Sequence, residues 1–278
     1  MAVIPKDVSA IAERIYAYYE KQESGRERLT RTGASGIGDE CLRSIWYDWR
    51  GAAASTFSGR ILRLFKTGHL QEERVLADLR GAGLEVWDFD ENGDQWTYIA
   101  GRGHAVAKLD GVVKGVPGAE KTPHTLEIKS SNLKGFKEIQ SRGVKIAKPY
   151  HYYQMQMGLW LSGMKDALYV VICKDDEQLY SERVKLDEEV VKEIEHKLDQ
   201  VINSEIPPLR LAEKEGDWRC KYCDSKEVCW GKVETRQTCR MCANSVVMDD
   251  GKWGCMQLKK ELTSNEQLKG CDLWKPIV

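Results

Sequence analysis

The feature that most constrains this chain is a strand–turn–strand stretch near the middle of the sequence. Asp110 ends a first apolar run, a turn rich in Pro and Gly follows, and a second run reads Leu126-Glu127-Ile128-Lys129. Successive side chains of a β-strand point to opposite faces. The alternation therefore predicts a strand that buries Leu126 and Ile128 and presents Glu127 and Lys129 together on the other face.

This grouping of charges suits a metal-dependent hydrolase. Hydrolysis of a phosphodiester needs a metal ion that neutralises charge on the phosphate and lowers the pKa of the attacking water. Asp110 and Glu127 are predicted to hold Mg²⁺ or Mn²⁺, hard ions that favour carboxylate oxygen. Lys129 is predicted to stay protonated and to orient the water or stabilise the transition state. A plainer alternative stays open, because Glu-x-Lys is also common on solvent-facing strands, where alternating charge solvates one side.

A helix predicted over residues 58–79 supplies two further candidates. His69 and Glu72 are three residues apart and share a helical face, and Gly68 leaves space beside them. Glu72 is predicted to add a carboxylate to the metal site, and His69 is predicted to be a further ligand. The buried side of this helix is predicted from its apolar positions, which are Ile61, Leu64, Phe65, Val75, Leu76 and Leu79.

The remaining periodicities predict an α/β chain. Apolar spacing typical of helices occurs at residues 8–21, 41–51, 132–142, 149–163 and 188–203, and strand-like runs occur at residues 84–89, 96–100, 105–113, 125–129, 167–173 and 180–186. The first four strands are expected to form a meander. This order predicts a core with its active face on the central strands, and Pro207-Pro208 is predicted to be a hinge into the C-terminal region.

The site residues resemble the PD-(D/E)XK nuclease superfamily, and within it the RecB-like and lambda-exonuclease-like branch. The matching motifs are Gly68-x-x-x-Glu72, Asp110 with Glu127-x-Lys129, and Gln154-Met155-Gln156. The resemblance implies a restriction-endonuclease-like core, with a central mixed sheet flanked by helices, in which Gln154 positions the phosphate or the lysine. The chain departs from the family at Gly158, where a Tyr often follows the Gln by four residues. Tyr150 and Tyr153 are the candidates to replace that tyrosine.

Cysteine spacing makes the resemblance more specific. The chain has nine cysteines, which in a reducing compartment favour metal binding over disulfides. The set Cys220-x2-Cys223-x5-Cys229, with the distant Cys41, resembles the iron–sulfur RecB-like nucleases of the CRISPR-adaptation and AddB types. In that group four such cysteines ligate a [4Fe–4S] cluster, so the resemblance implies a cluster that joins the two ends of the nuclease domain.

Four more cysteines follow in the last part of the chain. A closed zinc site is the simplest interpretation of Cys239-x2-Cys242-x12-Cys255-x15-Cys271, and Cys173 is then an ordinary buried thiol. Two alternatives stay open. A zinc-ribbon spacing also fits Cys220, Cys223, Cys239 and Cys242, and sequence does not distinguish a four-cysteine iron–sulfur site from a four-cysteine zinc site. We predict a nuclease domain at residues 1–235 and a zinc-binding module at residues 236–278.

Net charge does not identify a partner, because 42 Lys and Arg nearly balance 43 Asp and Glu. Two local windows favour a DNA track. Residues 128–150 hold six basic residues against one acid, and residues 26–66 hold eight against four. The sequence shows no signal peptide and no apolar run of membrane-spanning length, so we expect a cytoplasmic protein with no membrane partner.

The sequence-based hypothesis is a DNA nuclease that depends on Mg²⁺ or Mn²⁺. The resemblance favours an exonuclease that processes single- or double-stranded DNA ends in recombination, repair or phage replication, with a recombination or replication protein as a further partner. An alternative is a non-catalytic DNA-binding or assembly factor that retains the fold. A third hypothesis is a zinc-ribbon adaptor whose α/β core is only a scaffold.

Overall fold

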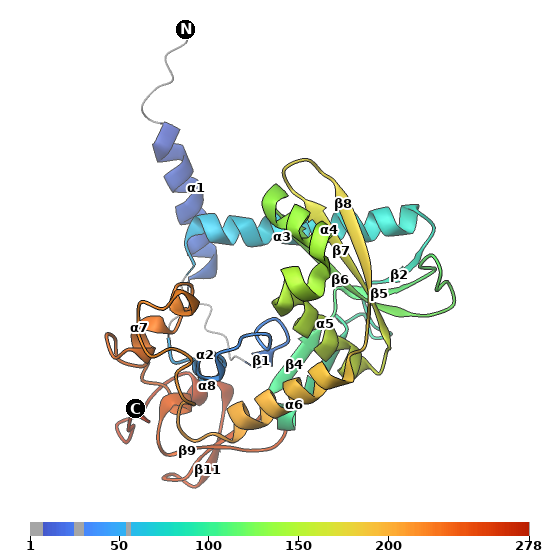
Figure 1. Cartoon of the computed structure of the whole chain (residues 1–278). Helices are drawn as coiled ribbons and strands as arrows, with labels where there is room; N and C mark the ends of the chain where they lie inside the picture. Colours follow the sequence, from blue (N-terminus) through green and yellow to red (C-terminus); the bar gives the residue numbers. More distant parts are fainter. Residues whose placement is uncertain (1–7, 25–30, 54–56, 278) are drawn as a thin grey trace.

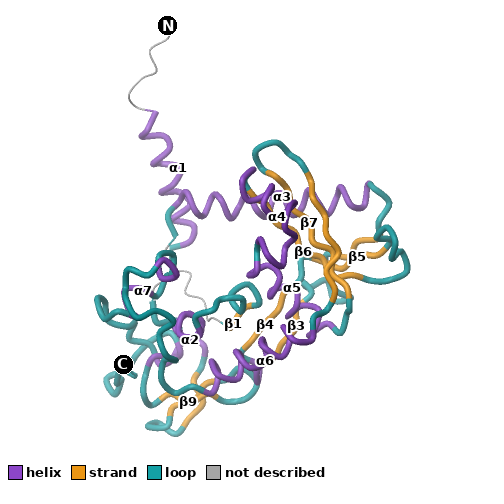
Figure 2. The backbone as a smooth tube through the Cα atoms, viewed as in Figure 1, coloured by secondary structure: helices purple, strands orange, loops and turns teal. Residues whose placement is uncertain are grey.

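The computed structural model describes residues 8–24, 31–53 and 57–277, and it is built around a mixed five-stranded sheet (Figures 1 and 2). The strands lie in the order β2 (Glu85–Trp87), β5 (Gly111–Lys114), β6 (His124–Ser131), β7 (Asp166–Cys173) and β8 (Leu179–Lys185). The pair β6 and β7 is parallel, and the other neighbours are antiparallel. Helices cover both faces of the sheet (Figure 1). The predicted α/β core, with a central mixed sheet flanked by helices, is confirmed.

The helices of the main body are α1 (Val8–Glu23), α2 (Leu42–Arg50), α3 (Gly59–Gly81), α4 (Leu133–Ala147), α5 (Pro149–Ser162) and α6 (Glu188–Asn203). All six were predicted, with ends that differ by a few residues. Of the helices that the structure describes, none is both long and apolar enough to cross a membrane.

Strand β7 shows how the two faces of the sheet are filled. Its alternate residues Leu168 and Val170 pack with Val75 and Leu76 of α3, while Tyr169 and its neighbours enter the larger core under α4 and α5. A strand covered on both faces is apolar throughout its length rather than at every second residue. Each large side chain buried here contributes about 1.5–3 kcal/mol of transfer free energy.

Two predictions about the first strands were wrong. The single strand expected at residues 105–113 is two strands, β4 (Ala105–Lys108) and β5, in different sheets. Leu109 N still donates to Trp96 O of the second sheet, whereas Asp110 N donates to Leu126 O of the first. The chain therefore changes sheets between residues 109 and 110.

The second sheet has three strands, so the expected meander is interrupted. Its order is β1 (Thr32–Gly33), β4 and β3 (Thr97–Ala100), with the 3₁₀ turn η1 (Gly101–Gly103) between β3 and β4. The apolar patterns of β4 and β5 are alike because both strands are buried. Their separate partners are non-local, and periodicity alone does not reveal them.

The predicted buried side of α3 was correct only for the second half of the helix. Leu64 and Phe65 are 42% and 45% exposed, whereas Val75 and Leu76 are buried. The first half packs against α1 instead of the sheet (Figure 1). At this crossing a side chain on Gly59 would collide with the backbone of Tyr16, and Glu20 accepts a hydrogen bond from Gly59 N.

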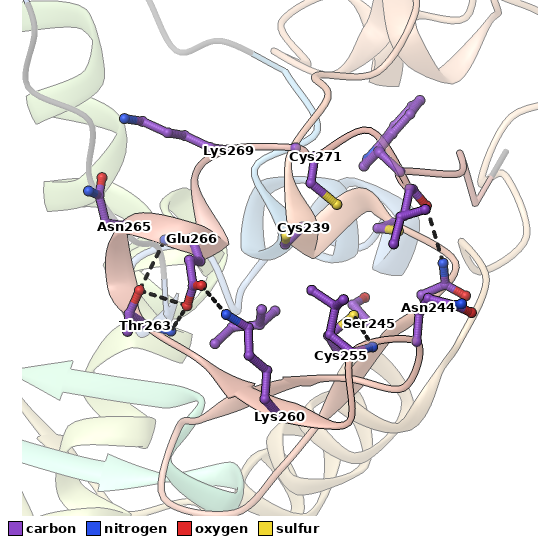
Figure 3. Close-up of a pocket in the computed structure, with 17 residues that line it drawn as sticks. Cys239, Asn244, Ser245, Cys255, Lys260, Thr263, Asn265, Glu266, Lys269 and Cys271 are labelled. Atoms are coloured by element: carbon purple, nitrogen blue, oxygen red, sulfur yellow. Dashed lines mark hydrogen bonds and ion pairs between the residues drawn. The ribbon is translucent and has the colours of Figure 1, made fainter.

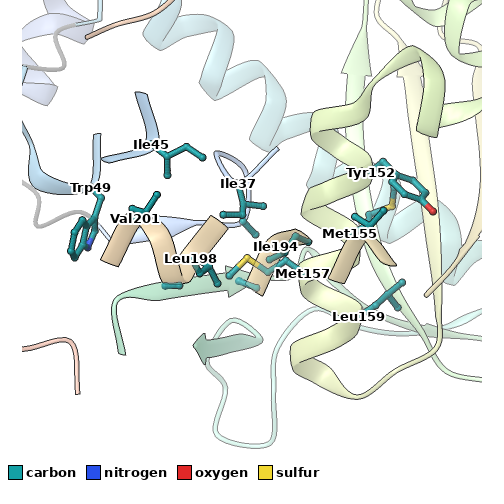
Figure 4. Close-up of a cluster of buried hydrophobic side chains, with 14 of the residues drawn as sticks. Ile37, Ile45, Trp49, Tyr152, Met155, Met157, Leu159, Ile194, Leu198 and Val201 are labelled. Atoms are coloured by element: carbon teal, nitrogen blue, oxygen red, sulfur yellow. The ribbon is translucent and has the colours of Figure 1, made fainter. Parts of the chain in front are cut away.

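The C-terminal region consists of short elements. They are η2 (Trp218–Cys220), α7 (Lys226–Cys229), η3 (Cys239–Met241), β9 (Ser245–Val247), β10 (Trp253–Cys255), β11 (Lys260–Leu262) and α8 (Ser264–Gln267). This region shares the large core with α2, α5 and α6, part of which Figure 4 shows around Trp49, Leu198 and Val201. Trp253 packs against Trp49 at a ring-centroid distance of 5.0 Å, with the two rings tilted by 42°, so the C-terminal region and α2 share buried side chains.

Candidate active site

Strand pairing places Asp110 beside Glu127. Gly111 of β5 pairs with Leu126 of β6, and the Asp110 carboxylate accepts a hydrogen bond of 2.7 Å from Ile128 N. Leu126 and Ile128 lie in the cluster covered by α3, as predicted. The intervening Glu127 points to the opposite face and is only 3% exposed.

The burial of Glu127 makes the solvated-strand interpretation wrong. A carboxylate that only solvates a strand lies in water, whereas burying one without a partner is costly. The partner here is the Lys129 ammonium, which forms an ion pair with Oε1 of Glu127 from the same strand face. Burial opposes the charge on Lys129, but the carboxylates of Glu127, Asp110 and Glu72 outweigh it and raise the pKa of Lys129. The lysine therefore remains a cation, as predicted.

Helix α3 brings Glu72 into the same electrostatic field. Burial raises the pKa of Glu72, and the negative charge of Asp110 raises it further, while His69 and Lys129 oppose this shift. His69 Nδ1 lies 3.8 Å from Glu72 Oε2, and the His69 side chain is 70% exposed. Four of the five predicted catalytic residues thus act on one another electrostatically, with His69 at the outer edge.

The three carboxylates are short of positive charge. Burial raises the pKa of Glu127 to about 8 despite Lys129, and burial is also the largest cause of the raised pKa of Asp110. Oε1 of Glu127 receives no hydrogen bond of good geometry within the described chain. A set of one buried and two partly buried carboxylates with one lysine has the composition that a hard divalent cation requires.

The described residues contain no group of three or more His, Cys, Asp or Glu side chains already arranged to hold a metal ion. This applies to the acids and to both cysteine sets. We call Asp110, Glu127 and Glu72 the acid set. Its fit to a cation therefore rests on its oxygen donors and on the burial that raises the pKa of each carboxyl.

Helix α5 carries the glutamine motif. Gln154 is half-buried on this helix, three residues after His151. Its neighbour Gln156 has a structural role, since it donates to Lys185 O at 2.9 Å and accepts from Asp187 N at 2.7 Å. A side chain on Gly158 would come within 2.8 Å of Leu109, so close packing of α5 against this chain segment disfavours a tyrosine at that position.

The two candidate replacement tyrosines have other partners. Tyr153 donates a hydrogen bond to Glu193 of α6, and the Lys197 ammonium lies over its ring. Asp39 and Cys41 are among the groups that act electrostatically on Tyr150, beside the first cysteine set. Neither tyrosine therefore replaces the family residue through any contact that the described chain shows.

Sequence reasoning missed the pair His151 and Tyr169. Tyr169 of β7 pairs in register with Glu127 of β6, and its hydroxyl lies 2.6 Å from His151 Nδ1. Burial, followed by the charge of Lys129, lowers the pKa of His151 to about 4, so the ring is neutral near pH 7. The spacing of His151 and Gln154 on one helix was a signal in the sequence, but the register of Tyr169 was not.

The first cysteine set lines one small, mostly apolar cavity. Its thiols are those of Cys41, Cys220, Cys223 and Cys229. Cys41 caps the N-terminus of α2, and its three partners come from residues beyond α6. Burial raises the pKa of Cys223, which a hydrogen-bonding contact of 3.6 Å with Ser44 opposes.

The second set lines a different cavity of about 330 Å³ (Figure 3). Its thiols are those of Cys239, Cys242, Cys255 and Cys271. Burial and then the neighbouring thiolates raise the pKa of Cys239 to about 11. Two backbone donors already point at sulfur, since Leu258 N lies 3.4 Å from Cys255 Sγ and Lys275 N lies 3.4 Å from Cys242 Sγ. The members of the rival zinc ribbon are divided between the two cavities, and Cys173 is buried in β7.

The basic windows are only partly available to a ligand. Arg50 is 3% exposed and lies against the rings of Trp46, Trp49 and Trp253. Arg26 and Arg28 lie outside the described residues. In the other window Lys145 is paired with Asp187, and Arg142 with Glu138.

Comparisons with known proteins give distant structural neighbours. The crystal structure of SSO0001 has a TM-score of 0.47 and 15% identity, covering 81% of this chain and 98% of that chain. An alkaline exonuclease (LHK-Exo) from Laribacter hongkongensis has a TM-score of 0.44 and 19% identity, covering 66% and 90%. LHK-Exo in complex with dAMP has a TM-score of 0.43 and 17% identity, covering 68% and 90%. No protein-family model and no curated protein matches the sequence. All three TM-scores are below 0.5 and all three identities are below 25%, so these likenesses are distant.

Proposed function

We propose that this protein is a deoxyribonuclease that hydrolyses phosphodiester bonds with the help of Mg²⁺ or Mn²⁺. The observation that carries the proposal is the set of Asp110, Glu127 and Glu72, in which burial raises the pKa of each carboxyl and Lys129 forms an ion pair with Glu127. Such a set is costly to a fold that does not use it. Perturbed and mutually coupled carboxylates are typical of catalytic sites.

Each residue has a distinct task in this proposal. Asp110 and Glu127 would hold the cation, with Glu72 and His69 at its outer side. A bound cation of this kind supplies charge neutralisation at the phosphate and an acidified water. Lys129 keeps its proton, orients the nucleophilic water and stabilises negative charge that develops on the phosphate. Gln154 positions the phosphate or the lysine from α5.

The finer assignment is an exonuclease that processes DNA ends in recombination, repair or phage replication. It rests on the motif resemblance, since the spacing of the acids does not separate end-directed from internal cleavage. The second candidate is a non-catalytic DNA-binding or assembly factor that retains this fold. The complete acid and lysine set favours the enzyme, because a factor without catalysis has no use for three neighbouring carboxyls whose charged forms burial disfavours.

We further propose that the two cysteine sets bind metal. Cys41 with Cys220, Cys223 and Cys229 would ligate a [4Fe–4S] cluster, and the set from Cys239 to Cys271 would ligate Zn²⁺. In support, the eight thiols divide between two cavities in these two groups. The cluster would tie α2 to the segment after α6.

A cleavage assay tests the nuclease. Purified protein is incubated with labelled linear and covalently closed circular DNA of the same sequence, with Mg²⁺ or Mn²⁺. We expect degradation of the linear form, and end-directed cleavage leaves the circle intact. If the Glu127→Ala variant or the Lys129→Ala variant cuts DNA as fast as the parent protein, the proposed site is wrong. DNA binding without cleavage under either metal supports the assembly-factor alternative.

A further inference from the structure

A basic groove separates the second sheet from the C-terminal region. It encloses about 860 Å³, which is within the usual size range of ligand sites. One wall is the outer side of β3 and β4, with Thr97 and Lys108, and the other is the β10–β11 hairpin with the start of α8. Arg31 and Arg240 also line it. No cysteine and no member of the acid set lines the groove, and it adjoins the second cysteine cavity through Leu262 and Thr263, which line both.

Positive charge in this groove exceeds negative charge. Its four Lys and Arg side chains are Arg31, Lys108, Arg240 and Lys252, against the single acid Glu261. Glu261 is already neutralised by Lys252, with Nζ and Oε2 3.1 Å apart. Neither Arg31 nor Lys108 has an ion-pair partner anywhere in residues 8–24, 31–53 and 57–277. Both side chains are exposed to the groove, so they are available to an anion.

Contacts between residues 102–104 and 248–251 join the two walls of the groove. Gly251 N donates to Arg102 O at 2.9 Å, and a side chain on Gly103 would come within 2.1 Å of Gly251 N. Arg102 also pairs with Asp249 at 2.7 Å, and His104 Nε2 lies 2.8 Å from Met248 O. These contacts fix the C-terminal wall against the turn between β3 and β4. A ligand therefore meets a preformed site and does not have to order it.

We propose that this groove binds the phosphate backbone of a single strand of DNA that continues from the acid set. The proposal rests on the proposed nuclease function for the identity of the polymer. Lys108 is two residues before Asp110, so at most about 7 Å of extended backbone separates the wall of the groove from the acids. One continuous ligand can reach both places, which favours a polymer over a small anion. We take a single strand as the occupant, and a duplex is the alternative that the test below distinguishes.

This assignment gives the C-terminal region a direct role in substrate binding. Its hairpin forms one wall of the strand path, whereas β4 forms the other and leads to the reacting acids. Phosphate contacts are the main source of affinity for nucleic acid, and they do not depend on base sequence. The binding is therefore expected to tolerate any sequence and to weaken steeply with salt.

The test measures binding of a fluorescent oligo-dT strand to the intact chain by anisotropy, with no divalent metal added. The double variant Arg31→Gln/Lys108→Gln removes the two unpaired cations, and both positions are exposed, so folding is expected to be retained. We expect its affinity to fall about tenfold or more. Two lost phosphate contacts should lower the slope of log K against log salt by about 1.4.

Lys192→Gln is the matched control, because this exposed lysine lies on α6 and is already paired with Glu189. The control should bind as the parent does. A double variant that binds like the parent, or a control that loses as much affinity, overturns the groove assignment. If the double variant weakens the binding of a DNA duplex as much as it weakens the binding of the single strand, the choice of a single strand is wrong. If the parent binds the strand but never cuts DNA with Mg²⁺ or Mn²⁺, the nuclease proposal fails separately.

Discussion

The acid set and the cysteine sets lie in opposite kinds of structure. Asp110 and Glu127 are held by the ladder of a five-stranded sheet, and their side chains are positioned by strand register. Most of the cysteines in the two sets lie on loops and on helices of three or four residues, where little regular hydrogen bonding fixes the backbone. The exceptions are Cys255, which ends the short strand β10, and Cys41, which is the N-cap residue of α2. The hydrogen bonds of the sheet can therefore hold carboxylates that repel one another. The C-terminal region has few such hydrogen bonds, and we expect its stability to depend on the proposed metal–thiolate bonds. Changes in the first should alter chemistry, and changes in the second should alter folding.

The two cysteine sets also differ from each other. Cys41 is distant in sequence from Cys220, Cys223 and Cys229, so their cavity brings together the start of α2 and the segment after α6. The set from Cys239 to Cys271 is local. Closing a longer loop restricts the unfolded chain more, although the entropy grows only slowly with length. Loss of metal from the first set should therefore affect the whole core, and loss from the second mainly the C-terminal end.

The largest expected effect is on catalysis at the acid set. Asp110→Asn keeps the shape of the side chain but removes one charge from the proposed cation site. We expect the cleavage rate to fall about 10³-fold or more, equivalent to roughly 4 kcal/mol in the barrier. Stability should not fall, because burial raises the pKa of Asp110 and the variant removes a charge that burial disfavours. Initial rates and thermal unfolding measure the two quantities.

Asp78→Asn is the control for this variant, since Asp78 is on the same helix as Glu72 but 56% exposed. Equal cleavage rates for the Asp110→Asn and Asp78→Asn variants would contradict a catalytic role for Asp110. A large loss of stability in Asp110→Asn would show that the acid set supports folding, as we expect only of the cysteine sets.

The second effect is on stability at the contact between α2 and the C-terminal region. Trp253 is fully buried between Trp49 and the guanidinium groups of Arg50 and Arg240. Trp253→Ala should cost about 3–5 kcal/mol in the free energy of unfolding. Urea unfolding measures this loss. Trp218→Ala should have little effect because Trp218 is 80% exposed, and similar losses in both variants would contradict the shared core.

A third, smaller effect concerns the first cysteine set. Cys41→Ala should release the iron of the proposed cluster and lower the free energy of unfolding by on the order of 2 kcal/mol. Elemental analysis should give about four iron and one zinc per parent chain, and zinc should persist in the variant. Cys173→Ala, at the buried C-terminal end of β7, should keep both metals. Zinc in both sets with no iron would contradict the cluster.

The smallest effect is a pH dependence at His104. Burial lowers the pKa of His104 more than its hydrogen bond to Met248 O raises it. The unfolded state then binds a proton more readily, so this residue favours folding at pH above about 6.5 and opposes it as the pH falls. His104→Gln should flatten the fall in stability between about pH 6.5 and 5. His196→Gln, on an exposed part of α6, should leave that profile unchanged. A profile of the His104 variant parallel to that of the parent would show that His104 is not responsible.

Local patterns were sufficient to predict the six helices and the acid motif. Alternation in Leu126-Glu127-Ile128-Lys129 identified the two faces of β6, because residue parity determines the face. These features depend on residues close together in sequence. The grouping of Cys41 with the distant Cys220, Cys223 and Cys229 came instead from the family resemblance and from counting the cysteines.

Features that depend on non-local pairing were not predictable. The change of sheet at Asp110 is set by whether Trp96 or Leu126 accepts a hydrogen bond from the backbone at that point. The exposure of Leu64 depends on where α1 packs. The basic groove depends on the contact between Gly103 and Gly251, which are far apart in sequence.

The most direct test of the central claim is Mn²⁺ binding at the acid set. Free Mn²⁺ is followed by electron paramagnetic resonance as the ion is added to the parent, to Glu127→Gln and to the exposed control Glu189→Gln. The proposed site predicts that the parent and the control remove Mn²⁺ from solution alike, and that Glu127→Gln loses this binding. Equal Mn²⁺ binding by all three proteins would contradict a carboxylate-bound cation at this centre.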